Sequence, residues 1–128
     1  MANIIKEIQK VLPDHKICES VYEGANIVLY TKDKNYFLDN EGSIKKAVDE
    51  FKKRIELRPD PSITADQKET EEFIRKSIPE EAGLARVIFD PQRSGVIIEV
   101  EKRGVAIGKQ GSVLKDIREK TFWVPVVR

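Results

Sequence analysis

An internal repeat is the feature that most constrains the fold of this 128-residue chain. When the second half is shifted back by 69 residues without gaps, residues 96–98 fall on residues 27–29, and other apolar positions align in the same way. The helical stripe near the start of each half repeats at an offset of 66 residues, from Ile8 to Ile74. Self-similarity at a fixed period indicates two copies of one structural unit.

The apolar periodicity gives the order of elements within each copy as helix, strand, strand, short helix, helix, strand. Short helices are expected to pack on one face of a three-stranded sheet, so the predicted fold class is α+β, an α/β sandwich in two tandem modules. The type of the short segment 36–38 stays open. The helical stripes lie at residues 4–12, 44–51, 73–78 and 113–117, and the strand-like patterns at 16–22, 27–30, 55–57, 84–89, 95–100 and 123–127.

The boundary between the copies is predicted from composition. Residues 59–62 read Pro-Asp-Pro-Ser, which is typical of a linker. The predicted domains are therefore residues 1–62 and 63–128. Ser43 is a plausible N-cap of the helix that follows it, and Thr64 with Gln67 fits a capping box.

The second copy carries a glycine-bounded turn, Gly108, Lys109, Gln110 and Gly111. We call it the GKQG loop. Glycine adopts positive φ and allows close approach of another backbone, and the amides of Gly111 and Ser112 would open a helix whose positive end favours an anion. Lys109 adds a cation and Gln110 a donor and an acceptor. The pattern favours a phosphate backbone as ligand, while a structural turn with glycine as helix C-cap is the alternative.

Cations flank this loop although the chain as a whole carries a net charge of only +1, so any nucleic-acid surface must be local. Arg103 and Lys115 are the nearest candidates for phosphate contacts. Arg118 and Lys120 could belong to the same basic patch. The alternative for these two residues is a solvated helix face with charge pairs four residues apart. Ile107, Leu114 and Ile98 are predicted to line an apolar groove for bases.

The segment VAIGKQGSVLKDI resembles the I-G-x-x-G signature of KH domains. The whole chain resembles the N-terminal region of archaeal β-CASP ribonucleases, relatives of the cleavage and polyadenylation specificity factor nuclease. In that family two KH-like domains precede a metallo-β-lactamase-type zinc nuclease. The resemblance implies two tandem type II KH-like modules, a role in transcription termination or RNA processing, and zinc only in a nuclease domain that is absent from this chain.

The first copy has Asp39, Asn40, Glu41 and Gly42 in place of the GKQG loop, and we call these residues the first loop. The first glycine is lost and two carboxylates take the place where a phosphate would lie, so like charges would repel. We therefore expect a degenerate KH-like domain without GxxG in residues 1–62. The predicted RNA-binding residues all lie in the second copy: Ile107, Gly108, Lys109, Gln110, Gly111, Ser112, Arg103 and Lys115.

Catalytic and metal chemistry is not indicated by this sequence. It has one cysteine, Cys18, and one histidine, His15, so it forms no internal disulfide and no His/Cys zinc site by itself. No nucleophile is placed beside His15 by any motif. The start of the chain lacks a signal-peptide pattern and no apolar run reaches membrane-spanning length, so we expect a cytoplasmic protein with no membrane partner.

The predicted function is binding of single-stranded RNA, or of single-stranded DNA, through the GKQG loop, which would position the strand for a downstream nuclease domain. The alternative is a protein-interaction or dimerisation module, a homodimer for example, whose nucleic-acid clamp is vestigial. The apolar residues on both faces of the strand-like segment 123–127 indicate a covered surface and keep that alternative open.

Overall fold

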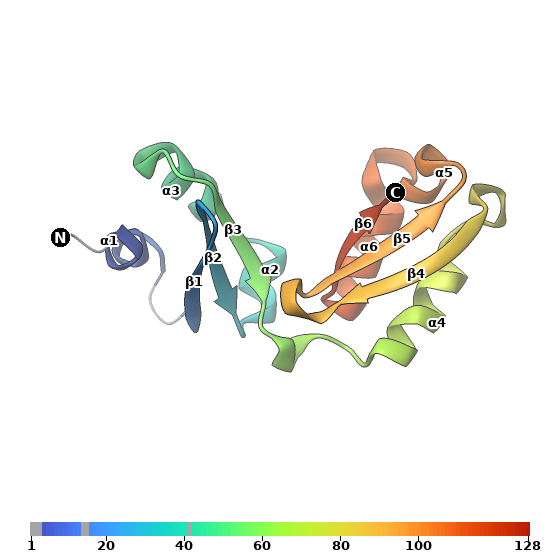
Figure 1. Cartoon of the computed structure of the whole chain (residues 1–128), viewed down its shortest axis with the longest axis horizontal. Helices are drawn as coiled ribbons and strands as arrows, with labels where there is room; N and C mark the ends of the chain where they lie inside the picture. The colour runs from blue at the N-terminus through green and yellow to red at the C-terminus, as the bar shows by residue number, and fades with distance from the viewer. Residues whose placement is uncertain (1–3, 14–15, 41) are drawn as a thin grey trace. The chain divides into compact units, whose positions relative to one another are not determined.

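The computed structural model describes residues 4–13, 16–40 and 42–128, so His15 and Glu41 lie outside the described residues. The chain divides into two compact units, Met1–Ser62 and Ile63–Arg128 (Figure 1). Each unit contains one three-stranded sheet with helices, as the α+β prediction requires. We call the units the first and the second module.

The first module runs α1 (Ile4–Val11), β1 (Glu19–Glu23), β2 (Asn26–Thr31), α2 (Lys34–Leu38), α3 (Ser43–Phe51) and β3 (Ile55–Pro59). Strand β1 pairs antiparallel with β2, and β2 pairs parallel with β3. A parallel pair needs a long crossover, which the helices α2 and α3 supply. The segment of open type, 36–38, is therefore helical.

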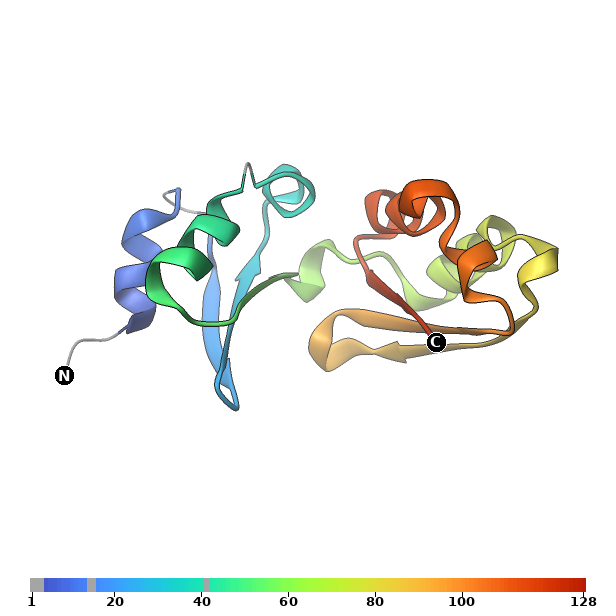
Figure 2. The same ribbon diagram turned by 90° about the horizontal axis from the view of Figure 1, so that it is seen from above.

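The second module repeats this order with α4 (Gln67–Ser77), β4 (Leu84–Asp90), β5 (Gly95–Val100), α5 (Arg103–Ile107), α6 (Ser112–Thr121) and β6 (Val124–Val127). Short 3-10 turns lie at Pro61–Ile63, Glu80–Ala82, Pro91–Arg93 and Lys109–Gly111. The sheet order β4-β5-β6 again combines one antiparallel and one parallel pair. Figure 2 shows the helices of this module on one side of its sheet. Strands β5 and β6 and helices α5 and α6 begin 69 residues after β2, β3, α2 and α3, which is the spacing of the sequence repeat.

The core of the second module lies between its sheet and its helices. Val96 and Ile98 on β5, Ile74 on α4 and Ile117 on α6 are fully buried there. Ile98 was predicted to line a groove for bases, and this prediction is wrong because its side chain belongs to the core. Alternation along a strand explains the difference, since every second residue of β5 faces the helices.

The apolar segment around β6 is shared between the two faces of the sheet. Trp123 is buried, its indole Nε1 donates to the carbonyl of Ala65 at 2.7 Å, and its ring meets Phe89 edge to face. Val127 packs against the core, whereas Val126 keeps 43% of its surface exposed. Core packing therefore accounts for Trp123 and Val127. Val126 lies on the face of the sheet that points away from the helices of its module.

Two predicted helix starts differ from the structure. Helix α3 is capped by Gly42 in the left-handed region, and the hydroxyl of Ser43 lies instead 2.7 Å from that of Tyr36. Helix α4 is capped by Asp66, whose carboxylate accepts from the amides of Lys68 and Glu69 at 3.0 and 3.2 Å. The predicted capping box at Thr64 thus places the N-cap of this helix two residues before its position in the structure. Helix α4 begins at Gln67, so Asp66 occupies the N-cap position, where aspartate is preferred over threonine.

Replacing Asp66 with alanine is expected to lower the free energy of unfolding of the second module by about 0.5–2 kcal/mol, since two amides at the start of α4 lose their acceptor. Urea unfolding followed by the fluorescence of Trp123, the single tryptophan in the chain and part of this core, measures the loss. Asp66→Asn keeps an acceptor at the same place and should recover most of the stability. Equal losses in both variants would rule out the cap.

Candidate nucleic-acid interface

The GKQG loop joins two helices at a sharp turn. Helix α5 ends at Ile107 and α6 begins at Ser112. Between them Gly108 has φ 82° and ψ 173°, Gln110 has φ 56°, and Gly111 has φ 74°. The predicted start of a helix directly after the loop is therefore present. Three of the four loop residues have positive φ, so the loop backbone continues neither α5 nor α6 as a regular α-helix.

The two glycines are required for different reasons. Gly108 lies in a region of φ and ψ that is essentially restricted to glycine, and a Cβ there would sit 2.7 Å from the Cγ2 of Val113 and 3.1 Å from the Val113 amide nitrogen. Gly111 lies in the ordinary left-handed region, and a Cβ there would meet nothing within 4 Å. The loop therefore excludes any side chain at Gly108, while at Gly111 only the backbone conformation opposes one.

A pair of alanine variants tests this difference. Gly108→Ala is expected to cost about 1–3 kcal/mol of stability for the backbone alone, with more from the contact with Val113. Gly111→Ala should cost about 1–2 kcal/mol, the penalty for an L-residue in the left-handed region. Urea unfolding followed by Trp123 fluorescence compares the two. A larger cost at Gly111 than at Gly108 would contradict this account of the loop.

The amides predicted to face a phosphate are used inside the loop. The amide of Gly111 donates to the carbonyl of Gly108 at 3.2 Å, and the amide of Ser112 donates to the carbonyl of Lys109. The prediction that both amides are open to a ligand is therefore wrong, because the loop closes into a 3-10 turn whose own carbonyls accept them. The exposed side chains of Lys109 and Gln110 remain as the outward groups of the loop.

Further cations flank the loop along the chain. Lys102 and Arg103 are exposed at the start of α5, and Lys115 is exposed on α6 with its Nζ 4.0 Å from the Oε1 of Glu119. Such an exposed pair stabilises little and leaves the lysine available to a phosphate. Arg118 is different, since burial lowers the pKa of its guanidinium below the usual value.

The apolar side chains near the loop are only partly covered. Ile107, Val113 and Leu114 are each half-buried, and all three flank the loop along the chain. They offer apolar surface next to the cations, whereas Ile98, in the core, does not.

The first loop has a different shape at its first position. Gly42 has φ 76°, close to the value of Gly111, and it caps α3 as Gly111 caps α6. Asp39, which stands where Gly108 does in the repeat, has φ −144°, an extended angle open to every residue. The two loops thus share their second turn and differ at the position of Gly108, whose φ and ψ are essentially restricted to glycine. The prediction for the Glu41 carboxylate concerns a residue outside the described ones.

A pocket lies beside the first loop, lined by Pro13, Lys16, Asp33, Asn35, Tyr36, Asp39 and Asn40. Within it the Nζ of Lys16 lies 2.5 Å from the carboxylate of Asp33, and this hydrogen bond lowers the pKa of Asp33. No three His, Cys, Asp or Glu side chains gather to hold a metal ion anywhere in the described part of the chain.

Cys18 is exposed, and its thiol donates to the carbonyl of Tyr30 at 3.3 Å. Partial burial and the neighbouring Asp60 raise the pKa of this thiol. A raised pKa leaves less thiolate at neutral pH, which disfavours a nucleophilic role. Among the described residues, no helix is long and apolar enough to span a bilayer.

Comparison with protein families matches both modules to KH domains. Residues 1–64 match the family described as "Transcription termination factor FttA, KH domain", and residues 69–121 match the family described as "KH domain". A solved structure titled "Crystal structure of APE1850" covers 98% of this chain and 93% of its own at 18% identity and a TM-score of 0.39, too low to support an inference.

Curated relatives carry the same name as the first family. The protein named transcription termination factor FttA from Methanosarcina mazei is 36% identical over 122 residues, which is 94% of this chain and 19% of that protein. The protein of that name from Pyrococcus abyssi is 36% identical over 97% of this chain and 20% of its own length. The one from a Lokiarchaeum is 31% identical over 92% and 19%.

The chain spans about a fifth of the length of these relatives. A family model nevertheless matches half of the chain, over the whole first module, and a general KH model matches most of the second. The chain therefore belongs to the family of the KH domain of transcription termination factor FttA.

Proposed function

We propose that this chain binds single-stranded RNA through the GKQG loop of its second module. KH domains hold single strands by clamping about four nucleotides of backbone against a GxxG loop. The observation that carries the proposal is the glycine-bounded geometry of the loop. Gly108 holds a backbone conformation essentially restricted to glycine, and a Cβ at Gly111 would meet nothing within 4 Å, so a strand can approach the loop closely at Gly111.

The side chains around Gly108 fit a phosphate backbone. Lys109, Arg103 and Lys115 are exposed cations, and Gln110 presents its amide from a left-handed backbone. Ile107 contributes apolar surface for a base, and Ser112 begins α6 with an exposed hydroxyl. No aromatic residue lies in the loop, so recognition of individual bases should be modest.

The first module is proposed to leave its loop unused for phosphate clamping. Asp39 replaces Gly108 with an extended backbone and brings a carboxylate to the place of closest approach. A negative charge there repels a phosphate. The two modules therefore share a fold and differ in whether their loop accepts a strand.

The longer protein is proposed to use this chain to position RNA during transcription termination, next to a zinc-dependent nuclease of the β-CASP type. The support is the name of the relatives and the resemblance to the N-terminal region of that nuclease family. This chain brings together no ligand set for zinc among its described residues, so the metal would be held by the nuclease part.

Titration of a fluorescently labelled single-stranded RNA with residues 1–128 tests the proposal. The affinity should fall linearly with the logarithm of the salt concentration, with a slope of about −0.7 for each phosphate neutralised. An unlabelled DNA strand of the same sequence, added as competitor, shows whether the 2′-hydroxyl contributes. Absence of salt-dependent binding would reject the proposal and favour the alternative of a protein-interaction module.

A further inference from the structure

We propose that the first module holds the sugar-phosphate backbone of single-stranded RNA at a second place, the turn between α3 and β3. This turn consists of Lys52, Lys53 and Arg54, and we call it the basic turn. It lies beyond the last residue of α3, whereas the first loop precedes the first residue of that helix. The inference rests on the proposed RNA binding and adds a binding surface that lies outside the GxxG loop.

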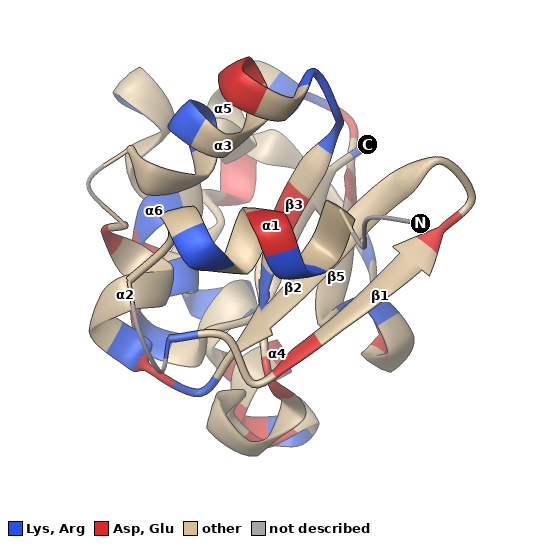
Figure 3. Cartoon of the chain, turned by 90° about the vertical axis from the view of Figure 1, so that its left-hand side faces the viewer, with Lys and Arg blue, Asp and Glu red and all other residues tan. Residues whose placement is uncertain are grey.

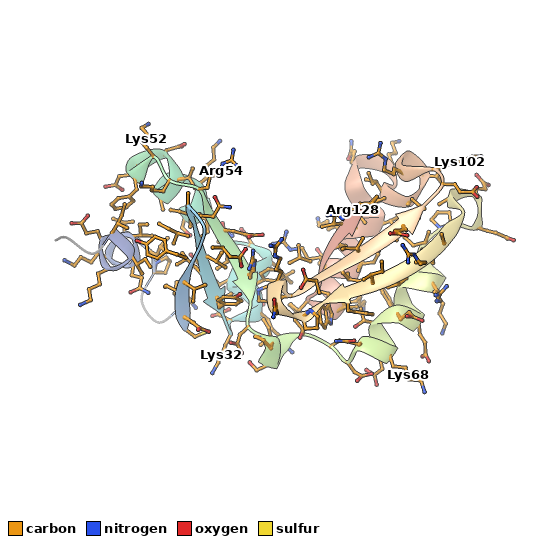
Figure 4. All side chains as sticks on the ribbon, viewed as in Figure 1. Lys32, Lys52, Arg54, Lys68, Lys102 and Arg128 are labelled. Atoms are coloured by element: carbon orange, nitrogen blue, oxygen red, sulfur yellow. The ribbon has the colours of Figure 1, made fainter. Side chains whose placement is uncertain are left out.

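The three cations of the basic turn are available to a ligand. All three residues are exposed, and none of them has a carboxylate within ion-pair distance among the described residues. In Figure 4 the labelled Lys52 and Arg54 extend away from their module. A cation without a carboxylate partner has no ion pair to break when it binds a phosphate.

The backbone of the basic turn is fixed at both ends. Lys52 has φ 57°, and its amide donates to the carbonyl of Val48 at 2.9 Å, which closes α3. The carbonyl of Arg54 accepts from the amide of Ile27 at 2.9 Å, which joins the turn to β2. A turn held in this way presents its side chains from a defined position, so less conformational entropy is lost on binding than in a mobile loop.

The equivalent connection in the second module indicates that the fold does not need these cations. There the residues between α6 and β6 are Phe122 and Trp123. Phe122 takes the same left-handed conformation as Lys52, with φ 62°, and Trp123 packs into the core. A helix C-terminus favours a cation only within its last turn, which accounts for Lys52 but leaves Arg54 unexplained.

Local charge supports the assignment of a polyanion as the ligand. Residues 45–54 contain five cations and two carboxylates, a net charge of +3 in ten residues, while the whole chain carries +1. Figure 3 shows the ribbon in blue where α3 leads into β3. Clusters of lysine and arginine on one face are the electrostatic footprint of nucleic-acid binding, and a KH module makes RNA the favoured polyanion.

The test replaces all three side chains with glutamine in the 128-residue chain and measures RNA affinity at several salt concentrations. If each cation neutralises one phosphate, the salt slope should become less negative by about 2, and the affinity at 0.1 M salt should fall by about 100-fold. The matched control removes three exposed cations from α4 in Lys68→Gln, Arg75→Gln and Lys76→Gln, where carboxylates alternate with them. The control should leave the slope within about 0.5 of the wild type.

The outcomes separate this inference from the proposed function. A variant of the basic turn that behaves as the α4 control does overturns the inference, and it leaves the proposed function standing if Lys109→Asp with Gln110→Asp, a change of two exposed side chains, still weakens binding. If the wild-type chain binds no RNA, both fail. Loss of binding to an acidic peptide, with RNA affinity and slope unchanged, would assign the turn to a protein partner and also overturn the inference. Circular dichroism of each variant checks that the first module remains folded.

Discussion

Replacing Lys109 and Gln110 with aspartate is expected to weaken the binding of single-stranded RNA by about 100-fold or more at 0.1 M salt. The double variant removes one cation and adds two carboxylates at the tip of the GKQG loop, where the phosphate backbone is proposed to lie. The salt slope should become less negative at the same time, since fewer counterions are released from the RNA. Fluorescence anisotropy with a labelled strand measures both quantities.

The same variant should fold as the wild type does. Both side chains are exposed, and Gln110 lies in the left-handed region, which aspartate visits more readily than most residues. The matched control is Gln67→Asp with Lys68→Asp, which makes the same change in charge on two exposed residues of α4. Wild-type affinity in the loop variant, or an equal loss in the control, would contradict a specific role of the loop.

Replacing Ile98 with alanine is expected to lower the free energy of unfolding of the second module by about 2–5 kcal/mol. The side chain is fully buried between the sheet and helices, and its removal leaves a cavity as well as losing apolar contacts. Trp123 fluorescence during urea unfolding reports on this module. The affinity of the folded fraction for RNA should change little, because Ile98 belongs to the core and offers no surface to a base.

Ile97 provides the control for that variant. It is the next residue on β5, it points to the opposite face of the sheet, and it is only half-buried. Ile97→Ala should therefore cost less stability than Ile98→Ala. A loss of RNA affinity in Ile98→Ala without a shift of the unfolding curve would restore the earlier assignment of Ile98 to a base-binding groove.

The repeat made the element order predictable from the sequence. Apolar residues that face a shared core recur with the period of their element, so β2, β5, α3 and α6 could be recognised from 27–30, 95–100, 44–51 and 113–117. The segment 36–38 could not be assigned, because three apolar residues fit a strand and a helix equally well. Its helical form follows from the Asp33 carboxylate, which accepts from the amide of Tyr36 at 2.9 Å.

The details of the site were less predictable. The positive φ angles of Gly108 and Gly111 follow from glycine itself, and the sequence indicated both. The hydrogen bonds that occupy the amides of Gly111 and Ser112 depend on how the loop closes, which no residue type dictates. Which apolar residue of a strand faces the core also depends on register, and a shift of one residue reverses it. For this reason the sequence pattern did not show that Ile98 faces the core.

The basic turn is visible in the sequence as three consecutive cations. A run of charge is usually a solvated surface, so the sequence alone gave no reason to single it out. The structure adds two observations: its backbone is fixed by Val48 and Ile27, and its counterpart in the second module is apolar. Comparison of the two modules therefore indicates which side chains, such as the cations of the basic turn, the shared fold does not require.

The most direct test of the central claim is a map of amide chemical shifts in the 128-residue chain during titration with single-stranded RNA. The proposed asymmetry predicts that the amides of residues 107–115 shift on binding while those of residues 39–42 stay in place. Equal or larger shifts in the first loop, or none in the GKQG loop, would contradict the assignment of the phosphate clamp to the GKQG loop.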